Sequence, residues 1–199
     1  VGGVQGQQKG TARFAWWMIV WLAGMFLCLA FVLVSYVHWY RKFRISTSVS
    51  DEWVCQWLKN HPLRRSVRIR QSEKVCTPLT YGIVHPVILI PENIFRENRE
   101  QMECILLHEY MHIRRCDTTL KLIAAFVLCV HWFNPMVWLL YVLLNRDIEL
   151  ACDESVVSRL GEGARAGYAR TLILLEEQKS GLALIGSHFS KNATEERIT

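Results

Sequence analysis

The chain has 199 residues with 23 lysines and arginines against 18 aspartates and glutamates, and its net charge of +5 is too small and too scattered for a nucleic-acid-binding surface. The 51% hydrophobic content and the eight tryptophans exclude an intrinsically disordered chain. Seven cysteines without a C-x-x-C pair argue against a secreted disulfide scaffold, and because the sequence does not start with methionine we expect a piece of a longer protein.

An apolar segment near the N-terminus predicts a transmembrane helix. Residues 14–40 include 27 positions without Asp, Glu, Lys or Arg, and a helix of that length is about 40 Å long, enough to cross a bilayer with some tilt. Aromatic residues lie at both ends of the run, as in interfacial belts. A signal peptide is the alternative, but the run is too long and no small-residue cleavage pattern follows it. Arg41, Lys42 and Arg44 come next, and the positive-inside tendency places the rest of the chain in the cytoplasm.

Three short segments then predict a helix and two strands. Residues 50–58 have the amphipathic spacing of a helix, and residues 67–71 alternate apolar and basic side chains as a half-exposed strand does. Residues 81–90 are rich in β-branched side chains but include Gly82 and Pro86, and because proline cannot donate to a ladder we expect an edge strand. Such an edge either pairs with an extended peptide substrate or is an ordinary edge that proline protects.

A second long apolar run predicts a helical hairpin. Residues 122–144 carry no charged side chain, but Asn134-Pro135 interrupts them, and an asparagine N-cap followed by proline starts a new helix. Each arm of about a dozen residues is too short to cross a bilayer alone. We therefore favour, over one spanning helix, a hairpin within residues 118–148 that is buried in the protein or dips into the membrane.

Between these elements, a helix that starts at the capping box Asn98–Gln101 carries the first residues with chemistry. His108 and His112 are four positions apart, so both imidazoles lie on one face and can bind the same Zn²⁺. Glu109 points toward the same opening, where it can hold a water beside the ion. A catalytic zinc site has three protein ligands and an open fourth position, so the motif requires a third ligand.

Glu149 is the candidate third ligand. It follows His112 by 37 residues, and the hairpin accounts for this separation because the chain leaves along one arm and returns along the other. Asp153, one turn later, is suited to accept the outer N–H of a ligating histidine, and Arg146, three residues earlier, can orient a carboxylate or contact substrate. A solvated acidic helix face is the simpler interpretation of both carboxylates, but the histidine pair favours the ligand.

Other side chains are alternatives for the third position. Cys104 and Cys116 continue the i+4 stripe of the two histidines, and a cysteine ligand would give a closed, structural zinc site. In a closed site Glu109 would have no function. Cysteines are also common beside the buried face of a helix, where they act as small apolar side chains. His131 is also a possible ligand, but it lies at the far end of the hairpin arm.

Four motifs follow one another along the chain. They are Gly82-x-x-x-Pro86-x-x-Leu89-x-Pro91, the His108-Glu109-x-x-His112 pair with Arg114-Arg115-Cys116-Asp117, His131-Trp132-Phe133-Asn134-Pro135-x-x-Trp138, and Arg146-x-x-Glu149-x-x-Cys152-Asp153-Glu154. This ordered set resembles the BlaR/MecR-type family of membrane metallopeptidases over roughly residues 67–175. The Arg-x-x-Glu-x-x-x-Asp element is also similar to HtpX-type and CAAX-prenyl membrane proteases.

We accordingly expect an α+β, mainly helical fold: a membrane-embedded, gluzincin-like metallopeptidase domain with a small edge-strand sheet and an N-terminal transmembrane helix. The expected parts are an N-terminal segment 1–44, a zinc metallopeptidase domain 45–178 that includes the hairpin, and a C-terminal linker 179–199. The resemblance implies Zn²⁺ bound by two histidines and a glutamate, here His108, His112 and Glu149, with Glu109 as general base. Arg146 and Tyr168 are candidates to contact the oxyanion.

The implied function is a zinc endopeptidase in the cell membrane, multi-pass in the full-length protein, with its active site facing the cytoplasm. The expected partners are a protein substrate, namely a transcriptional repressor in signalling of the β-lactam-resistance type, and membrane lipid, without direct binding of nucleic acid. No Ser-x-x-Lys acylation motif is present, so a penicillin-binding sensor domain would lie elsewhere in the full-length protein. The alternatives are a non-catalytic signalling module braced by zinc and a housekeeping membrane protease.

Overall fold

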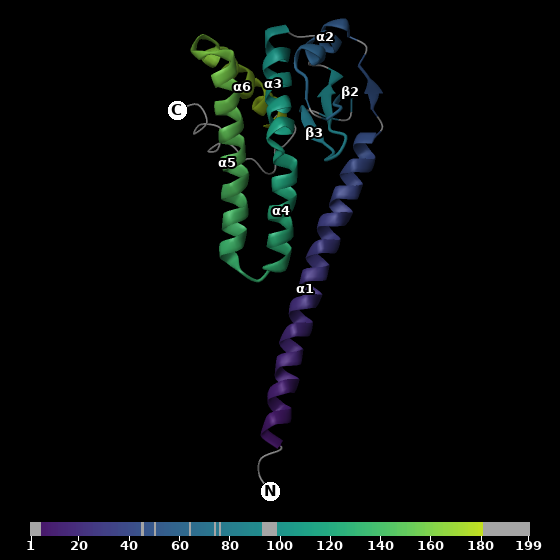
Figure 1. Cartoon of the computed structure of the whole chain (residues 1–199), viewed down its shortest axis with the longest axis vertical. Helices are drawn as coiled ribbons and strands as arrows, with labels where there is room; N and C mark the ends of the chain where they lie inside the picture. Colours follow the sequence, from purple (N-terminus) through teal and green to yellow (C-terminus); the bar gives the residue numbers. More distant parts are fainter. Residues whose placement is uncertain are drawn as a thin grey trace.

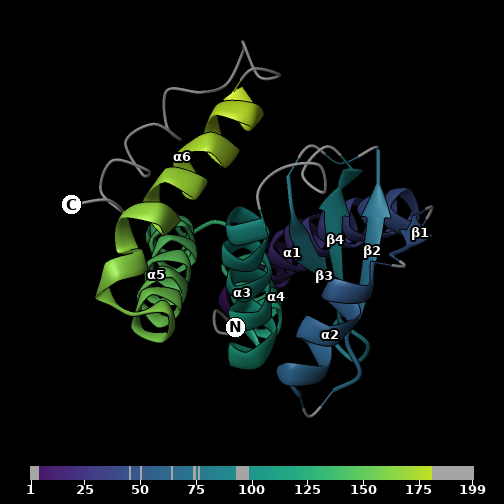
Figure 2. The same cartoon turned by 90° about the horizontal axis from the view of Figure 1, so that it is seen from above.

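The computed structural model describes residues 5–44, 46–49, 51–63, 65–73, 75, 77–92 and 99–180. Its elements in chain order are α1 (Gln5–Arg44), β1 (Thr47–Ser48), α2 (Glu52–Asn60), β2 (Arg68–Ser72), β3 (Leu79–Tyr81), β4 (Val87–Pro91), α3 (Arg99–Arg115), α4 (Asp117–Val130), α5 (Pro135–Leu160), the 3₁₀ turn η2 (Glu162–Ala164) and α6 (Arg165–Ser180). Figures 1 and 2 show α3 between a small sheet on one side and α5 and α6 on the other, while α1 extends well beyond the rest. The expected mainly helical fold with a small sheet is confirmed.

Helix α1 is the element expected to span a membrane. Among the described helices it is the one that is long and apolar enough to do so, over Trp16–Arg41. Midway along its length α1 packs against the turn of the hairpin. Trp21 Nε1 donates to the carbonyl of Val130 at 2.9 Å, and Trp132 Nε1 donates to the carbonyl of Trp21 at 3.3 Å. Gly24 allows this close crossing, since a Cβ there would lie 2.3 Å from the Trp132 side chain.

The sheet has the order β1-β2-β4-β3, in which β4 is parallel to β2 and antiparallel to β3. The prediction of one edge strand over residues 81–90 is therefore wrong. Gly82, at φ 89°, starts a connection that divides the segment into the end of β3 and the interior strand β4. Pro86 and Pro91 flank the β-branched run rather than interrupt it, so its N–H groups are free to pair on both sides. The edge strand beside α3 is β3.

Helix α2 and strand β2 form close to where the sequence predicts them. Asp51 is the N-cap of α2 and accepts a hydrogen bond from the Trp53 N–H at 2.8 Å, so the helix begins two residues later than expected. Its buried Trp57 packs edge-to-face on Tyr110 of α3, with ring centroids 5.9 Å apart. Helix α3 contributes more buried residues to the core than any other element, and its histidine face is turned toward α5. Residue 98 of the predicted capping box lies outside the described residues.

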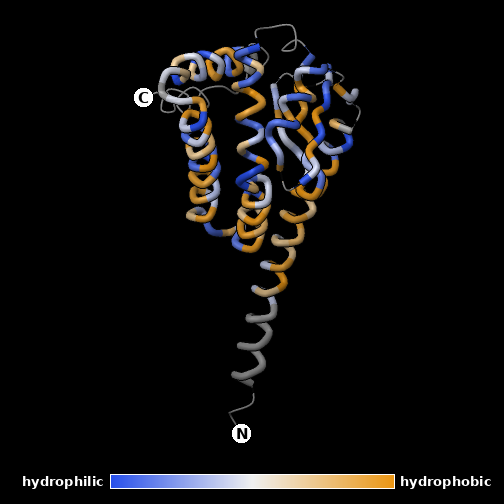
Figure 3. The backbone as a smooth tube through the Cα atoms, turned by 45° about the horizontal axis from the view of Figure 1, so that its top comes forward, coloured by the Kyte–Doolittle hydropathy of each residue, from blue (hydrophilic) through white to orange (hydrophobic). Residues whose placement is uncertain are grey.

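Helices α4 and α5 form the predicted hairpin. Asn134 caps α5 by accepting the Met136 N–H at 2.9 Å, and Pro135 is the first helical residue. The outer surface of both arms is exposed and apolar: Leu120, Ile123, Phe126, Val127, Phe133, Met136, Trp138, Leu139, Leu140, Val142 and Leu143. The described chain thus leaves the outer surface of the hairpin uncovered, and Figure 3 shows the apolar colour on both arms and on the neighbouring part of α1.

Candidate metal centre

Two imidazoles on α3 form the centre of the candidate site. The Nε2 atoms of His108 and His112 lie 3.1 Å apart, and the rings meet edge-to-face with centroids 4.7 Å apart. Their side chains are only 14% and 12% exposed. Two ring nitrogens at this separation, one helical turn apart, can bind the same cation.

Helix α5 brings Glu149 to the same point, as the hairpin predicts. Its Oε2 lies 3.8 Å from Nε2 of His108 and 3.6 Å from Nε2 of His112. Ligand atoms around a tetrahedral zinc are about 3.4 Å apart, given metal–ligand bonds of about 2.1 Å. The two nitrogens and the carboxylate oxygen therefore already have nearly the spacing of three zinc ligands. The second oxygen, Oε1, accepts from Lys121 Nζ at 2.9 Å, which leaves Oε2 directed at the histidines.

Each histidine has a hydrogen-bond partner on its outer nitrogen. Asp117, buried at the start of α4, lies 2.7 Å from His112 Nδ1 through its Oδ2. Tyr168 of α6 lies 2.8 Å from His108 Nδ1 and donates its hydroxyl to Asp153 at 2.6 Å. Such partners hold the tautomer in which Nε2 carries the free lone pair. Asp153 is itself 3.3 Å from His108 Nδ1, the position that its spacing in the sequence predicts.

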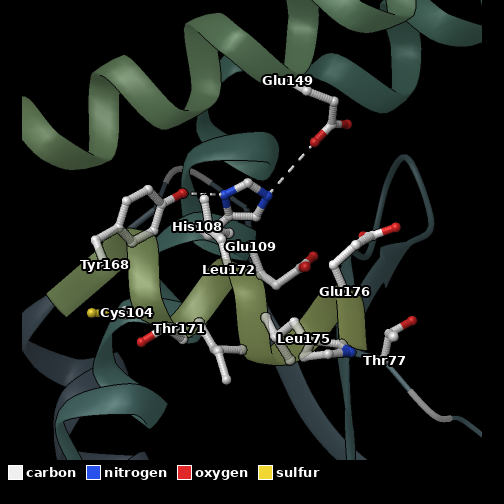
Figure 4. A pocket seen from close by; sticks show the side chains of 12 residues that line it. Thr77, Cys104, His108, Glu109, Glu149, Tyr168, Thr171, Leu172, Leu175 and Glu176 are labelled. Atoms are coloured by element: carbon white, nitrogen blue, oxygen red, sulfur yellow. Dashed lines mark hydrogen bonds and ion pairs between the residues drawn. The ribbon is translucent and has the colours of Figure 1, made fainter. Parts of the chain in front are cut away.

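The sequence does not indicate two of these contacts. Asp117 belongs to the Arg114-Arg115-Cys116-Asp117 motif, but its contact with His112 depends on the turn at Cys116, whose φ of 61° redirects the chain between α3 and α4. The sequence suggests Tyr168 as a contact of the oxyanion, whereas Figure 4 places it on the side of the His108 ring opposite Glu149. Arg146 is exposed on α5, so its role stays a prediction.

A buried thiol also lies near the histidines. Cys152 Sγ is 3.8 Å from His108 Nδ1, and the three groups His108, His112 and Cys152 have donor atoms within 4.8 Å of one another. Burial would raise the pKa of this thiol, but its hydrogen bonds with the two histidines lower it. The thiol also donates to the backbone carbonyl of His108 at 3.5 Å, so it lies on the side of the outer nitrogen. Glu149 instead faces both Nε2 atoms. Glu149 and Cys152 therefore approach the histidine pair from different positions, Glu149 at the two Nε2 atoms and Cys152 at the outer nitrogen of His108.

The charges around the two rings favour a cation. Burial alone would lower the pKa of His108, but hydrogen bonds with Asp153 and Cys152 raise it to about 9. Burial also opposes protonation of His112, yet hydrogen bonds with Cys152 and Glu149 raise its pKa to about 11. Burial would raise the pKa of Glu149, but the neighbouring histidine and lysine hold it well below its ordinary value. Positive charge is therefore stabilised between the rings, as a divalent cation requires.

Glu109 lies beside the histidines and is nearly buried. Its Oε2 accepts a hydrogen bond from Thr80 Oγ1 of the edge strand β3 at 2.6 Å. The other carboxylate oxygen is left for a water or a substrate proton. Glu109 lines two adjoining hollows together with His108 and Glu149, one of about 90 Å³ between α3 and α6 and one of about 630 Å³ between β3, α1 and α4. Figure 4 shows His108, Glu109 and Glu149 around the smaller hollow.

Comparison with known proteins identifies the family of the chain. The model of the BlaR1 peptidase M56 family matches residues 5–199. The chain belongs to this family. Regulatory protein BlaR1 of Bacillus licheniformis is 28% identical over 140 residues, which are 66% of this chain and 23% of that protein. Methicillin resistance mecR1 protein of Staphylococcus aureus is 23% identical over 168 residues, 82% of this chain and 28% of that protein. The chain therefore spans about a quarter of the length of the curated relatives it matches.

Membership in the BlaR1 peptidase M56 family, a metallopeptidase family, implies a metal, and the residues present fit one. Two imidazole nitrogens and one carboxylate are a donor set used by zinc hydrolases, and the outer hydrogen bonds of both histidines are the support that such ligands need. In the described part of the chain, the donor atoms that lie within 4.8 Å of one another belong to His108, His112 and Cys152, so neither Cys104 nor Cys116 is among them. His131 is at the opposite end of α4 from His112, where it caps the helix.

Proposed function

We propose that this chain is the catalytic part of a membrane-bound zinc endopeptidase of gluzincin type, with Zn²⁺ bound by His108, His112 and Glu149. The observation that carries the proposal is the convergence of these three donor atoms, 3.1 to 3.8 Å apart, at a hollow that Glu109 also lines. When bound, zinc would supply Lewis acidity that polarises the scissile carbonyl and makes water more acidic.

Glu109 is the general base in this proposal. Its carboxylate takes the proton of the attacking water and passes it to the leaving amine, so it must stay correctly oriented through both steps. The hydrogen bond from Thr80 fixes one carboxylate oxygen and leaves the other free for the water. Tyr168 and Asp153 act through His108, whose orientation they hold, and Asp117 does the same for His112.

The edge strand β3 supplies a way to position the peptide. It pairs with β4 on one side, and in the described chain no strand pairs with its other side. Leu79 and Thr80 of β3 line the same hollow as His108 and Glu109. A substrate in extended conformation can therefore add to this edge, where backbone hydrogen bonds hold its scissile bond beside the base.

We further propose that α1 spans the cell membrane and that the catalytic site faces the cytoplasm. The basic residues Arg41, Lys42 and Arg44 at the end of α1 support this orientation, and the exposed apolar surface of the hairpin supports contact with lipid. In the full-length protein further membrane passes and a sensor domain would lie outside this chain. The names of the relatives, a regulatory protein and a methicillin resistance protein, support a role in regulation. A transcriptional repressor as the substrate is what the resemblance of the sequence motifs implies.

The experiment that tests the function measures cleavage of a randomised peptide library by the detergent-solubilised protein, with and without a zinc chelator. We expect cleavage that chelation abolishes and added zinc restores. Glu109→Gln should bind zinc with the same stoichiometry but cleave at least about a thousandfold more slowly, given the usual contribution of a general base and its orientation. Zinc binding without turnover by the unsubstituted protein would instead favour the non-catalytic, zinc-braced module. Indiscriminate cleavage of unfolded proteins would favour a housekeeping protease.

A further inference from the structure

The larger hollow at the metal centre extends toward the apolar end of the molecule. At one end it is lined by the catalytic group, His108, Glu109, His112 and Glu149. At the other it is lined by Val32 and Tyr36 of α1, Leu122 and Ala125 of α4, and Tyr141 of α5. The same groove thus continues from the proposed scissile position to side chains of the candidate membrane span.

The position of the groove along α1 places it at the membrane surface. Tyr36 lies five residues before Arg41, the end of the candidate span, which corresponds to about 7.5 Å along the helix. The opposite end of the hairpin contacts Trp21 and Gly24, near the other end of that span. The hairpin therefore lies beside α1 through most of the apolar length (Figure 1). Residues of both α1 and the hairpin line the groove near the end of the candidate span.

The side chains that line the groove are polar at its catalytic end and largely apolar at its other end. On one wall, α1 is tied to the edge strand, because Tyr81 of β3 packs against the rings of Tyr40 and Phe43, at 6.0 and 5.8 Å. Polar side chains on the walls, such as Thr80 and Lys121, lie at the catalytic end, and aliphatic and tyrosine side chains lie at the other. A ligand that matches both ends has hydrogen-bonding groups near the metal centre and an apolar part that extends to the other end of the groove.

We propose that this groove binds an apolar, membrane-associated segment of the protein substrate, which reaches the catalytic residues along the bilayer surface between α1 and the hairpin. A polypeptide fits both ends of the groove, since its backbone can pair with β3 while its apolar side chains occupy the apolar end. A lipid acyl chain matches only the apolar end. The inference rests on the proposed peptidase function and names the kind of substrate segment that the enzyme selects.

The first test maps the occupant with a photo-crosslinking amino acid in the Glu109→Gln chain, reconstituted in phosphatidylcholine/phosphatidylglycerol nanodiscs. The crosslinker p-benzoylphenylalanine replaces either Leu122, in the groove, or its neighbour Ile123, which is 56% exposed on the outer face. The probes are two peptide libraries with the same randomised centre, one with a leucine-rich flank of about twelve residues and one with a serine-rich flank. We expect peptide adducts at position 122 with the leucine-rich library, and lipid adducts alone at position 123.

The second test measures selectivity in the chain that retains Glu109. The larger side chain of Ala125→Leu partly fills the groove and should lower the preference for the leucine-rich over the serine-rich library about tenfold. Ile123→Leu is the matched control and should leave this preference unchanged. Lipid adducts at position 122 that excess peptide does not displace, or equal cleavage of both libraries, would overturn the inference. Peptide adducts at position 122 without any cleavage would overturn the peptidase function and leave the groove as a peptide-binding site.

Discussion

Removal of the Asp117 carboxylate tests whether the outer hydrogen bonds of the histidines hold the metal centre together. Asp117 is 3% exposed, and its Oδ2 lies 2.7 Å from His112 Nδ1. In Asp117→Ala the imidazole loses the acceptor that fixes its tautomer and orientation, so Nε2 presents its lone pair to zinc only part of the time. Loss of such a partner typically weakens metal binding about 10- to 100-fold, or about 1.4 to 2.7 kcal/mol.

The assay is competition for zinc with a chromophoric chelator at pH 7.5. Asp117→Asn should lose less affinity than Asp117→Ala, because its amide oxygen can still accept the Nδ1 hydrogen. Asp147→Ala is the matched control, since it removes an exposed carboxylate and the same formal charge. The circular dichroism spectrum of each variant checks that the helices remain. Equal zinc affinity of Asp117→Ala and the unsubstituted chain would refute the assignment of Asp117 as the support of a ligand.

Three further predictions concern the base, the protons and the membrane helix. Thr80→Val removes the hydroxyl that holds Glu109 and should lower kcat by about tenfold with little change in zinc content, measured by peptide turnover and metal analysis. Because the folded-state pKa of His108 is raised to about 9, its proton stabilises the metal-free protein below about pH 6.5, and this stabilisation is lost as the pH rises through 9. Thermal melts of the metal-free protein in chelator should show the unfolding midpoint falling from pH 6 to 10. The affinity for zinc should rise over the same range. An unfolding midpoint that rises with pH would contradict the raised pKa of His108. In Gly24→Leu the new Cβ would lie 2.3 Å from the Trp132 side chain, so α1 should move away from the hairpin turn. The yield of a disulfide crosslink engineered between α1 and this turn should therefore fall. Ala23→Leu, at an exposed position of the same helix, is the control and should leave the yield unchanged.

Much of the site follows from local sequence because helical spacing alone fixes it. His108 and His112 share one face of α3 wherever that helix packs, and Glu109 accompanies them. The hairpin was predictable from Asn134-Pro135, since a proline that cannot continue one helix begins another. Because the two arms have similar lengths, the prediction that Glu149 returns to the level of the histidines agrees with the structure.

Contacts between distant segments were not predictable in the same way. The segment 81–90 looks like an edge strand by composition, yet β4 is interior because the two prolines flank it and β3 takes the edge. The packing of α6 against α3 decides that Tyr168 supports His108, and the left-handed turn at Cys116 decides that Asp117 supports His112. Neither contact has a local sequence period that indicates it.

The amino-acid sequence by itself determined the helices, the hairpin and the chemical groups of the centre, because these depend on spacing within one element or on one proline. Only the tertiary structure decided which carboxylate faces Nε2, which groups hold Nδ1, and that the groove at the metal centre extends between α1 and the hairpin. The physical reason is that such contacts join residues far apart in the chain, so their geometry is set by how whole helices pack rather than by the residues on either side.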